Sequence, residues 1–374
     1  MAEVLTPKEM LSRLVGFETV VGRSNLDLMY FVSAYLTGHG ISCHLLTGPE
    51  GDRANLFATI GDPVQPGYIL SGHVDVVPAG EPDWLGDPFT LREIEGHLIG
   101  RGACDMKGFV AAVLAAAPHL AAIELTVPVH LALSYDEEAG CKGVPHLIAA
   151  LPDLCAPPVG CIVGEPTGLT PVLAHKGKAA LRLVAQGMSG HSSRPDLGRN
   201  AIHALLPALH AAADTARALE EHGPQDARFT PPWSSLQIGT LRGGQALNII
   251  PDHAEAEIEA RAIAGIDPSE MLAPVVAAAG DGVRVEWLSR YPALALEADH
   301  PLAALTTRIA GRAALGAVSF GTEAGLFQAA GVPAIICGPG DIARAHRPEE
   351  YLHVDELQAA YDMVLALGRT LERG

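Results

Sequence analysis

The chain has 374 residues, enough for two or three domains, and 48% of its residues are hydrophobic while only 18% are charged. Because so apolar a chain can bury a large core, this composition excludes intrinsic disorder as its main character. The formal net charge of −18 argues against a nucleic-acid partner and against docking on an anionic membrane, since both need a basic face.

The sequence favours neither a membrane span nor export. Its richest apolar run, Val110 to Ile123, contains Pro118 and His119 and is shorter than the ~18 apolar residues of a span. The N-terminal segment carries acids and lacks the basic and apolar regions of a secretory signal. The six cysteines are scattered without CxxC pairs, which is typical of reduced thiols. We therefore expect a cytoplasmic protein.

Short apolar runs that end in polar clusters alternate with helical patterns. The runs are Gly67–Ser71, Val127–Tyr135, Val159–Val163 and Val332–Cys337, and the helical patterns include Gly108–Ile123 and Val354–Leu371. Runs that are apolar on both faces are typical of parallel strands covered by helices. We predict an α/β domain with a mixed, mostly parallel sheet, whose polar clusters lie at the carboxyl ends of the strands, where ligands bind.

Between Lys178 and Tyr291 the pattern is different. Alternation of apolar and polar residues predicts half-exposed strands at Ala179–Gln186 and Asp252–Ala262, and helices are predicted at Asn200–Leu219 and from Asp267 on. The order of strand, helix, two strands, helix and strand resembles a split βαβ sandwich. We predict that 179–291 form a smaller α+β domain inserted into a larger domain made of 1–178 and 292–374.

Single polar residues at the predicted strand ends indicate little when each is taken alone. His73 and Asp75 share one side of a strand end, so Asp75 can bond the ring nitrogen that His73 does not give to a metal. A histidine that simply has its hydrogen bonds satisfied is the more common case. Asp105 lies in a glycine-rich turn before a helix, where a single acid is more often a helix cap or a solvated residue.

The run Asp136-Glu137-Glu138 is more informative, because three carboxylates directly after a buried strand are costly without compensating cations. One of them can bind a metal while its neighbour reaches a water; the alternative is a solvated acidic turn. Glu165 closes another strand, and His346 follows the last one, where an ordinary loop histidine is the alternative.

Taken together, two histidines and at least four acids fall at four strand ends of one sheet. Mixed histidine and carboxylate ligands suit Zn, Mn or Co, and a shared carboxylate suits two ions ~3.5–4 Å apart. Such a pair activates a water and polarises a carbonyl, and a free glutamate is then needed to move the proton. The residues alone therefore predict a two-metal hydrolase.

The motif set supports this prediction. In this order, HVDVVP, GRGACDMKG, DEEAG, GEPT, HKGK, SGHSS and GPGDIARAHRPEEY resemble the di-zinc metallopeptidase family of aminoacylases, carboxypeptidases and deacylases, over essentially the whole chain. The stretches WLGDPFTL, GEPTGLTPVLAHKGKA and GTEAGLF further imply removal of the acetyl group from N2-acetyl-L-ornithine, a step of arginine biosynthesis. The resemblance also implies a homodimer, and it makes 179–291 a lid and dimerisation domain beside a catalytic domain.

Carried over by position, the resemblance implies a ligand set for two Zn²⁺ ions, with Co²⁺ as an alternative. His73 and Glu165 would hold one ion, Glu138 and His346 the other, and Asp105 would bridge them. Cys104, just before Asp105, is a mild departure from the pattern of the family, in which small residues vary at this position.

The resemblance assigns the remaining site residues as well. Glu137 would be general base and acid towards a water that bridges the metals, and Asp75 would orient His73. His191 would reach the substrate carbonyl of the partner subunit, and Asn248 and Arg261 match substrate-contacting positions, although the surrounding match is looser.

Glu323, in GTEAGLF, would favour a substrate with a second amine; a solvated loop acid or a charge at a helix N-terminus is the alternative.

Other readings of the sequence are less favoured. A serine hydrolase is disfavoured because the nearest approach to GxSxG lacks its last glycine, and a zincin is disfavoured because HExxH is absent. A dinucleotide-binding loop is disfavoured because Gly338-x-Gly340-x-x-Ala343 leads towards Pro348, which interrupts any helix. Within the family, succinyl-diaminopimelate, a dipeptide or another N-acyl amino acid stays open as the substrate. A non-catalytic metal-binding protein is the alternative from another class, but such a protein would be expected to lose Glu137 or a ligand.

Overall fold

The structure, a computed structural model, describes residues 3–373 and divides into two compact units. Unit 1 comprises the chain up to Leu173, Leu296–Gly316 and the segment from Thr322 on. Unit 2 comprises Ala174–Ala295 and Ala317–Gly321. Unit 2 thus begins before the predicted boundary at 179 and also includes a short segment that the sequence analysis assigned to the larger domain.

A six-stranded sheet forms the centre of unit 1, in the order β1-β2-β6-β3-β7-β14. Its strands are β1 (Ser42–Thr47), β2 (Ala54–Ile60), β6 (Val129–Ser134), β3 (Tyr68–His73), β7 (Gly160–Pro166) and β14 (Ala334–Gly338). The last four run parallel to one another, while β2 is antiparallel to both of its neighbours, β1 and β6. The predicted mixed, mostly parallel sheet is confirmed.

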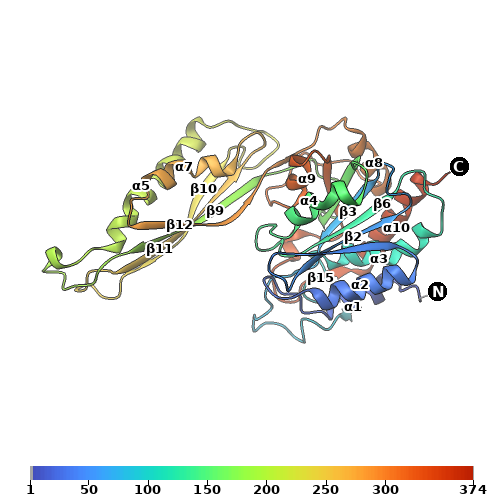
Figure 1. Cartoon of the computed structure of the whole chain (residues 1–374), viewed down its shortest axis with the longest axis horizontal. Helices are drawn as coiled ribbons and strands as arrows, with labels where there is room; N and C mark the ends of the chain where they lie inside the picture. The colour runs from blue at the N-terminus through green and yellow to red at the C-terminus, as the bar shows by residue number, and fades with distance from the viewer. Residues whose placement is uncertain (1–2, 374) are drawn as a thin grey trace. The chain divides into compact units, whose positions relative to one another are not determined.

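Helices cover both faces of this sheet, and for this reason every residue of β6 is buried. They are α1 (Pro7–Val15), α2 (Leu26–Gly38), α3 (Lys107–Ala121), α4 (Val144–Leu154), α8 (Pro301–Ala310), α9 (Ala324–Ala329) and α10 (Val354–Leu371). Figure 1 shows α1, α2 and α3 on one side of the sheet and α4 and α9 on the other. Helix α3 packs against α1 and α10, and its alanine-rich sequence lets it be buried almost throughout.

Shorter elements complete unit 1. Strands β15 (Tyr351–His353), β5 (His97–Ile99) and β4 (Arg92–Ile94) form a small sheet, and a 3₁₀ turn covers Ile342–Arg344. This turn, and not a long helix, directly follows Gly338 and Gly340, in agreement with the expectation that Pro348 interrupts a helix after the dinucleotide-like motif.

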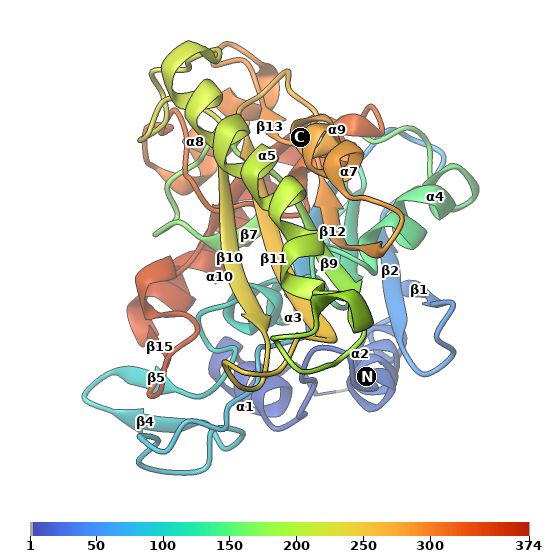
Figure 2. The ribbon, with the colours of Figure 1, turned by 90° about the vertical axis from the view of Figure 1, so that its left-hand side faces the viewer.

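Unit 2 is built on a four-stranded antiparallel sheet in the order β10-β11-β9-β12. Its elements are β8 (Ala174–His175), β9 (Gly177–Gln186), a 3₁₀ turn (Pro195–Leu197), α5 (Ala201–His222), β10 (Ser235–Gly243), β11 (His253–Ala262), α6 (Pro268–Met271), α7 (Ala273–Ala278), β12 (Val283–Tyr291) and β13 (Leu294–Ala295). Figure 2 shows α5 crossing one face of the sheet. The predicted α+β split βαβ arrangement is confirmed.

Candidate metal centre

Four of the predicted metal ligands and the predicted base, Glu137, lie at one edge of the sheet of unit 1. His73 ends β3, Glu137 and Glu138 follow β6, Glu165 lies near the end of β7, and His346 lies in the loop after β14. Because these four strands are parallel neighbours, their carboxyl ends meet at the same edge. The fold itself therefore brings the five side chains together.

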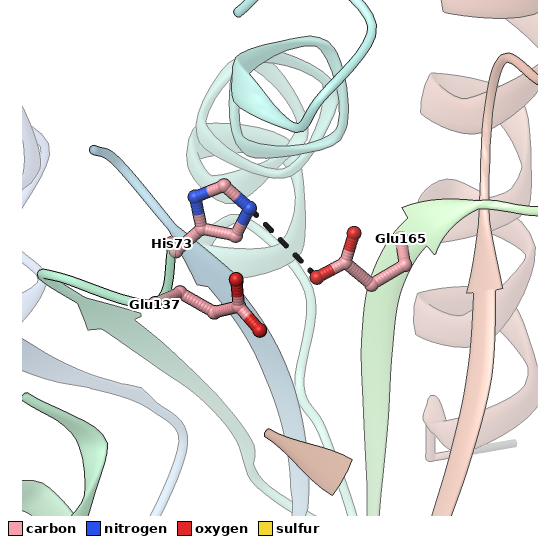
Figure 3. Close-up of side chains that lie close together, drawn as sticks. All are labelled: His73, Glu137 and Glu165. Atoms are coloured by element: carbon pink, nitrogen blue, oxygen red, sulfur yellow. Dashed lines mark ion pairs between the residues drawn. The ribbon is translucent and has the colours of Figure 1, made fainter. Parts of the chain in front are cut away.

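His73 forms the buried end of the centre. Its Nε2 lies 3.1 Å from Oδ1 of Asp105, on the turn before α3, and 3.8 Å from Oε1 of Glu165. Figure 3 shows His73, Glu137 and Glu165 turned towards one another from three neighbouring segments. With only 1% of its side chain exposed, His73 presents a single open ring nitrogen to these acids.

His346 forms the accessible end. Its Nε2 lies 2.9 Å from Oε1 of Glu138 and 3.2 Å from Oδ2 of Asp105, and about half of its side chain is exposed. Asp105 thus faces the two histidines with different oxygens, as a shared ligand would. This contact pattern joins all five predicted ligands into one cluster.

The donor set fits divalent metal ions. Two groups, His73 with Glu137 and Glu165, and His73 with Asp105 and Glu138, each bring ligand atoms within 4.8 Å of one another. Imidazole nitrogens mixed with carboxylate oxygens suit Zn, Mn or Co. The roles of the individual residues as ligands, and the inclusion of His346 among them, stay predictions.

Electrostatics at the centre are those of a site that favours cations. Burial raises the pKa of Glu137 to about 8, with a contribution from Glu138, although His73 opposes the shift. Burial, reinforced by Asp105, also raises the pKa of Glu165 well above its usual range. Hydrogen bonds to Asp105 and Glu138 raise the pKa of His346 to about 10. A cation placed here relieves repulsion among the acids.

Asp75 contacts His73 in a different way from the predicted one. Nδ1 of His73 lies 2.9 Å from the backbone oxygen of Asp75 and 3.6 Å from its carboxylate. The carboxylate instead accepts the backbone N–H groups of Glu137 and Glu138, each at 3.1 Å. Asp75 therefore holds the histidine with its main chain and the acidic turn with its side chain.

Several contacts around the centre were missed by the sequence analysis. The Cys141 thiol donates to Oε1 of Glu137 at 3.2 Å. The buried Lys107 ammonium donates to the carbonyl oxygens of Leu14 and Phe17, and burial lowers its pKa to about 7. Glu350 binds the turn of Asp105. The motifs that contain these residues do not say which atoms they contact, so only the fold reveals the contacts.

Glu323 lies in an environment that argues against the predicted contact with a substrate amine. Its side chain is buried, and its two oxygens accept the hydroxyl groups of Ser71 and Ser134 at 2.6 and 2.7 Å. Burial raises its pKa, and the two hydroxyl groups oppose that shift. Because both of its oxygens are already engaged and its residue is only 1% exposed, the carboxylate offers no open position to a substrate amine.

The other predicted substrate contacts belong to unit 2. His191 and Asn248 are exposed neighbours, because the N–H of Ser192 donates to the backbone oxygen of Asn248 at 3.0 Å. Nδ1 of His191 accepts the Ser193 hydroxyl at 2.8 Å, which leaves Nε2 for another partner. Arg261, on β11, is already bound to Glu259 at 2.7 Å. The predicted roles of all three residues stay predictions.

Comparisons with known proteins agree with this geometry. Residues 69–369 match the model of peptidase family M20/M25/M40. The acetylornithine deacetylases of Photorhabdus laumondii and Proteus mirabilis are each 32% identical, over 89% and 91% of this chain and 87% and 89% of theirs.

Solved structures of this family have the same fold. A metallo-carboxypeptidase from Sulfolobus solfataricus superposes with a TM-score of 0.80 at 18% identity, covering 99% of both chains. A dinuclear metal-binding peptidase from Bacillus subtilis superposes with a TM-score of 0.62 at 15% identity, covering 98% of both chains. By family match, curated relatives and fold together, the chain belongs to peptidase family M20/M25/M40 and is an enzyme, a metal-dependent hydrolase.

Proposed function

We propose that the chain is an acetylornithine deacetylase, which hydrolyses N2-acetyl-L-ornithine to L-ornithine and acetate in arginine biosynthesis. The names of the two bacterial relatives support this substrate, since each matches at 32% identity along most of both chains. The six free cysteines are compatible with the reducing cytoplasm in which such a biosynthetic step takes place.

The observation that carries the proposal is the position of Asp105 between two histidines. One carboxylate oxygen faces His73 and the other faces His346, at 3.1 and 3.2 Å. In the proposed assignment His73 and Glu165 hold one divalent ion, Glu138 and His346 hold a second, and Asp105 bridges them. The Bacillus subtilis protein of the same fold is a dinuclear metal-binding peptidase, which supports two ions. When bound, Zn²⁺ or Co²⁺ would lower the pKa of water and polarise the amide carbonyl.

Glu137 is proposed to move the proton. Its Oε1 accepts the Cys141 thiol at 3.2 Å, and its carboxyl group lies close to His73 and Glu165, with ligand atoms of all three within 4.8 Å of one another, so it stands beside a proposed ion position. A carboxylate in this position takes a proton from the attacking water and delivers it to the amide nitrogen as the bond between that nitrogen and the acetyl carbon breaks.

Unit 2 is proposed to complete the site in a homodimer. The free Nε2 of His191 is a suitable donor to the carbonyl oxygen of a substrate bound by the partner subunit, where negative charge develops during attack. Asn248, beside it, and Arg261 are the proposed contacts to the rest of the substrate. The edge strands β10 and β12 offer unpaired backbone for association between two copies.

A substrate panel tests the proposal. The chain, loaded with Zn²⁺ or Co²⁺, is assayed on N2-acetylornithine, N-acetylmethionine, N-succinyl-diaminopimelate and a dipeptide. We expect kcat/KM for acetylornithine to exceed each of the others at least about tenfold, which corresponds to about 1.4 kcal/mol of transition-state binding. A higher kcat/KM for another amide would show that this amide, and not acetylornithine, is the preferred substrate. Absence of any hydrolysis with metal bound would contradict the proposal.

A further inference from the structure

Glu350 is a buried carboxylate that binds the backbone of the turn carrying Asp105. Its Oε1 accepts the N–H groups of Cys104 and Asp105, at 3.0 and 3.1 Å, and its Oε2 lies 2.8 Å from a guanidinium nitrogen of Arg101. Only 1% of either side chain is exposed. Both oxygens of Glu350 are therefore engaged, one by the turn and one by the arginine.

Arg101 is itself held from several sides. It donates to Oε1 of Glu81 at 2.9 Å and to the backbone oxygen of Pro78 at 3.2 Å, and its guanidinium lies 5.2 Å from the ring centre of Trp84. A guanidinium fixed in this manner sets the orientation of the carboxylate that it pairs with.

The arrangement acts on the candidate centre through the main chain. Asp105 has to point one oxygen at His73 and the other at His346, so the direction of its backbone decides whether both contacts form. Glu350 lies on the same loop as His346, and its carboxylate ties this loop to the Asp105 turn. Buried ion pairs often add little stability compared with apolar side chains of the same size, so a geometric role is the better account of this one.

We propose that Glu350 is a positioning residue, which sets the direction of Asp105 towards both metal positions, and that Arg101 sets the direction of Glu350. This inference rests on the proposed two-metal function. Groups that orient metal ligands typically contribute 10–100-fold to metal affinity. The contribution comes from the hydrogen-bond acceptor at position 350, and the charge of the ion pair is not needed for it.

Two double variants separate the effect of the hydrogen-bond acceptor at position 350 from the effect of the ion-pair charge. In Arg101→Met/Glu350→Gln the amide oxygen can still accept the N–H groups of Cys104 and Asp105, whereas Arg101→Met/Glu350→Met has no acceptor. Both variants lack the ion pair and have side chains of similar length. The binding of Zn²⁺ to metal-free protein is measured by competition with a chromogenic chelator, together with the thermal midpoint of the metal-free form.

We expect the Met/Met variant to bind Zn²⁺ about 10–100-fold more weakly than the Met/Gln variant, measured at a temperature well below the metal-free thermal midpoints of both, where each is fully folded. Equal Zn²⁺ affinities of the two variants would overturn the positioning role. If wild-type chain bound no Zn²⁺, the proposed function would fail and the inference with it, so the two failures are distinguishable.

A pair of single variants gives an independent comparison should a double variant not fold. In Glu350→Gln the amide oxygen is drawn to the Arg101 guanidinium, the stronger donor, so the NH₂ group faces the N–H groups of Cys104 and Asp105 and these lose their acceptor. Glu349→Gln is the matched control, because the Glu349 carboxylate is engaged by Arg92 and the N–H of Leu85 instead of by the Asp105 turn. Only Glu350→Gln should weaken Zn²⁺ binding about tenfold or more. An equal loss in Glu349→Gln would contradict the inference.

Discussion

The Nε2 of His73 lies 3.1 Å from Oδ1 of Asp105, although 32 residues separate the two in the chain. The contact forms because β3 and the turn before α3 end at the same edge of the sheet. Without a bound cation a histidine ring is the positive partner of the acids around it, and hydrogen bonds from His346 and His73 lower the pKa of Asp105 against the opposing effect of burial. A bound metal ion would take the place of the protonated histidine rings as the source of positive charge among these acids.

Metal removal should therefore destabilise the chain. The acids of the centre repel one another, and an ion that binds only the folded state stabilises it by about 2.7 kcal/mol at a free concentration a hundredfold above its Kd. We expect Zn²⁺ added to chelator-treated protein to raise the thermal midpoint, and to raise it less in Glu165→Ala. A midpoint that is unchanged by Zn²⁺ in the wild type would argue against a metal centre.

Subunit mixing tests the proposed role of His191. Losing one donor to the developing oxyanion costs ~10²–10³ in kcat, so the homodimers of His191→Ala and of Glu137→Gln should each be nearly inactive. A mixed dimer holds one site that combines an intact base with a histidine from the other subunit, and exchange of subunits should therefore restore activity. Confirmed exchange without any gain in activity, or normal turnover of His191→Ala, would show that the histidine does not act across the dimer.

Replacement of Glu323 should lower kcat/KM by the same factor for different substrates. The structure surrounds its carboxylate with Ser71 and Ser134, so Glu323→Ala leaves two buried hydroxyl groups without their acceptor, at a cost of about 1–3 kcal/mol each. We expect lower stability and an equal fractional loss of kcat/KM on acetylornithine and on acetylmethionine. A loss confined to acetylornithine would restore the hypothesis of a direct contact with the second amine.

His130 should make the folded state sensitive to acid. Its ring is buried, stacks on Phe57, and has no partner for Nε2 among residues 3–373, and burial lowers its pKa to about 4. Between about pH 6.5 and pH 4 the unfolded chain therefore binds a proton at this residue that the folded chain does not bind. The stabilising effect of the neutral ring is complete above about pH 6.5 and is lost as the pH falls towards about 4.

This pH dependence is measured by urea unfolding of the wild type and of His130→Gln, which does not titrate. The wild type should lose about 2–3 kcal/mol more than the variant between pH 7 and pH 4. The same substitution at the exposed His44 is the control for the loss of a histidine as such. Parallel curves for the wild type and His130→Gln would contradict the prediction.

The sequence was sufficient to predict those parts of the fold that repeat a pattern. Continuous apolar runs predict buried parallel strands, and the polar residues that end them predict a site at one sheet edge. Val354–Leu371 is helical over the predicted range, because an acidic first turn and a 3.6-residue apolar period both favour α10 there. The helix of unit 2 predicted from Asp267 on ends after Met271 and resumes as α7, because Pro274 is favoured in the first turn of a new helix and disfavoured inside a continuing one.

Contacts between distant segments could not be predicted in this way. Glu350 and Asp105 are separated by 245 residues, and nothing local to either indicates a hydrogen bond between a side chain and a main-chain N–H. The alternation of side chains along a strand placed Asp75 beside His73 but could not show that its backbone oxygen makes the contact. Whether an acid such as Glu323 is buried depends on the packing of α9 against β7 and β14, which is a property of the whole fold.

The central claim, a two-metal hydrolase in which Glu137 moves the proton, is tested most directly by the metal content and turnover of Glu137→Gln. The amide keeps the size of the side chain but cannot accept the proton of water. The account predicts the same two ions per chain as in the wild type, with kcat on N2-acetylornithine lowered by at least ~10²–10⁴. A variant that contains both ions and turns over at nearly the wild-type rate would contradict the account.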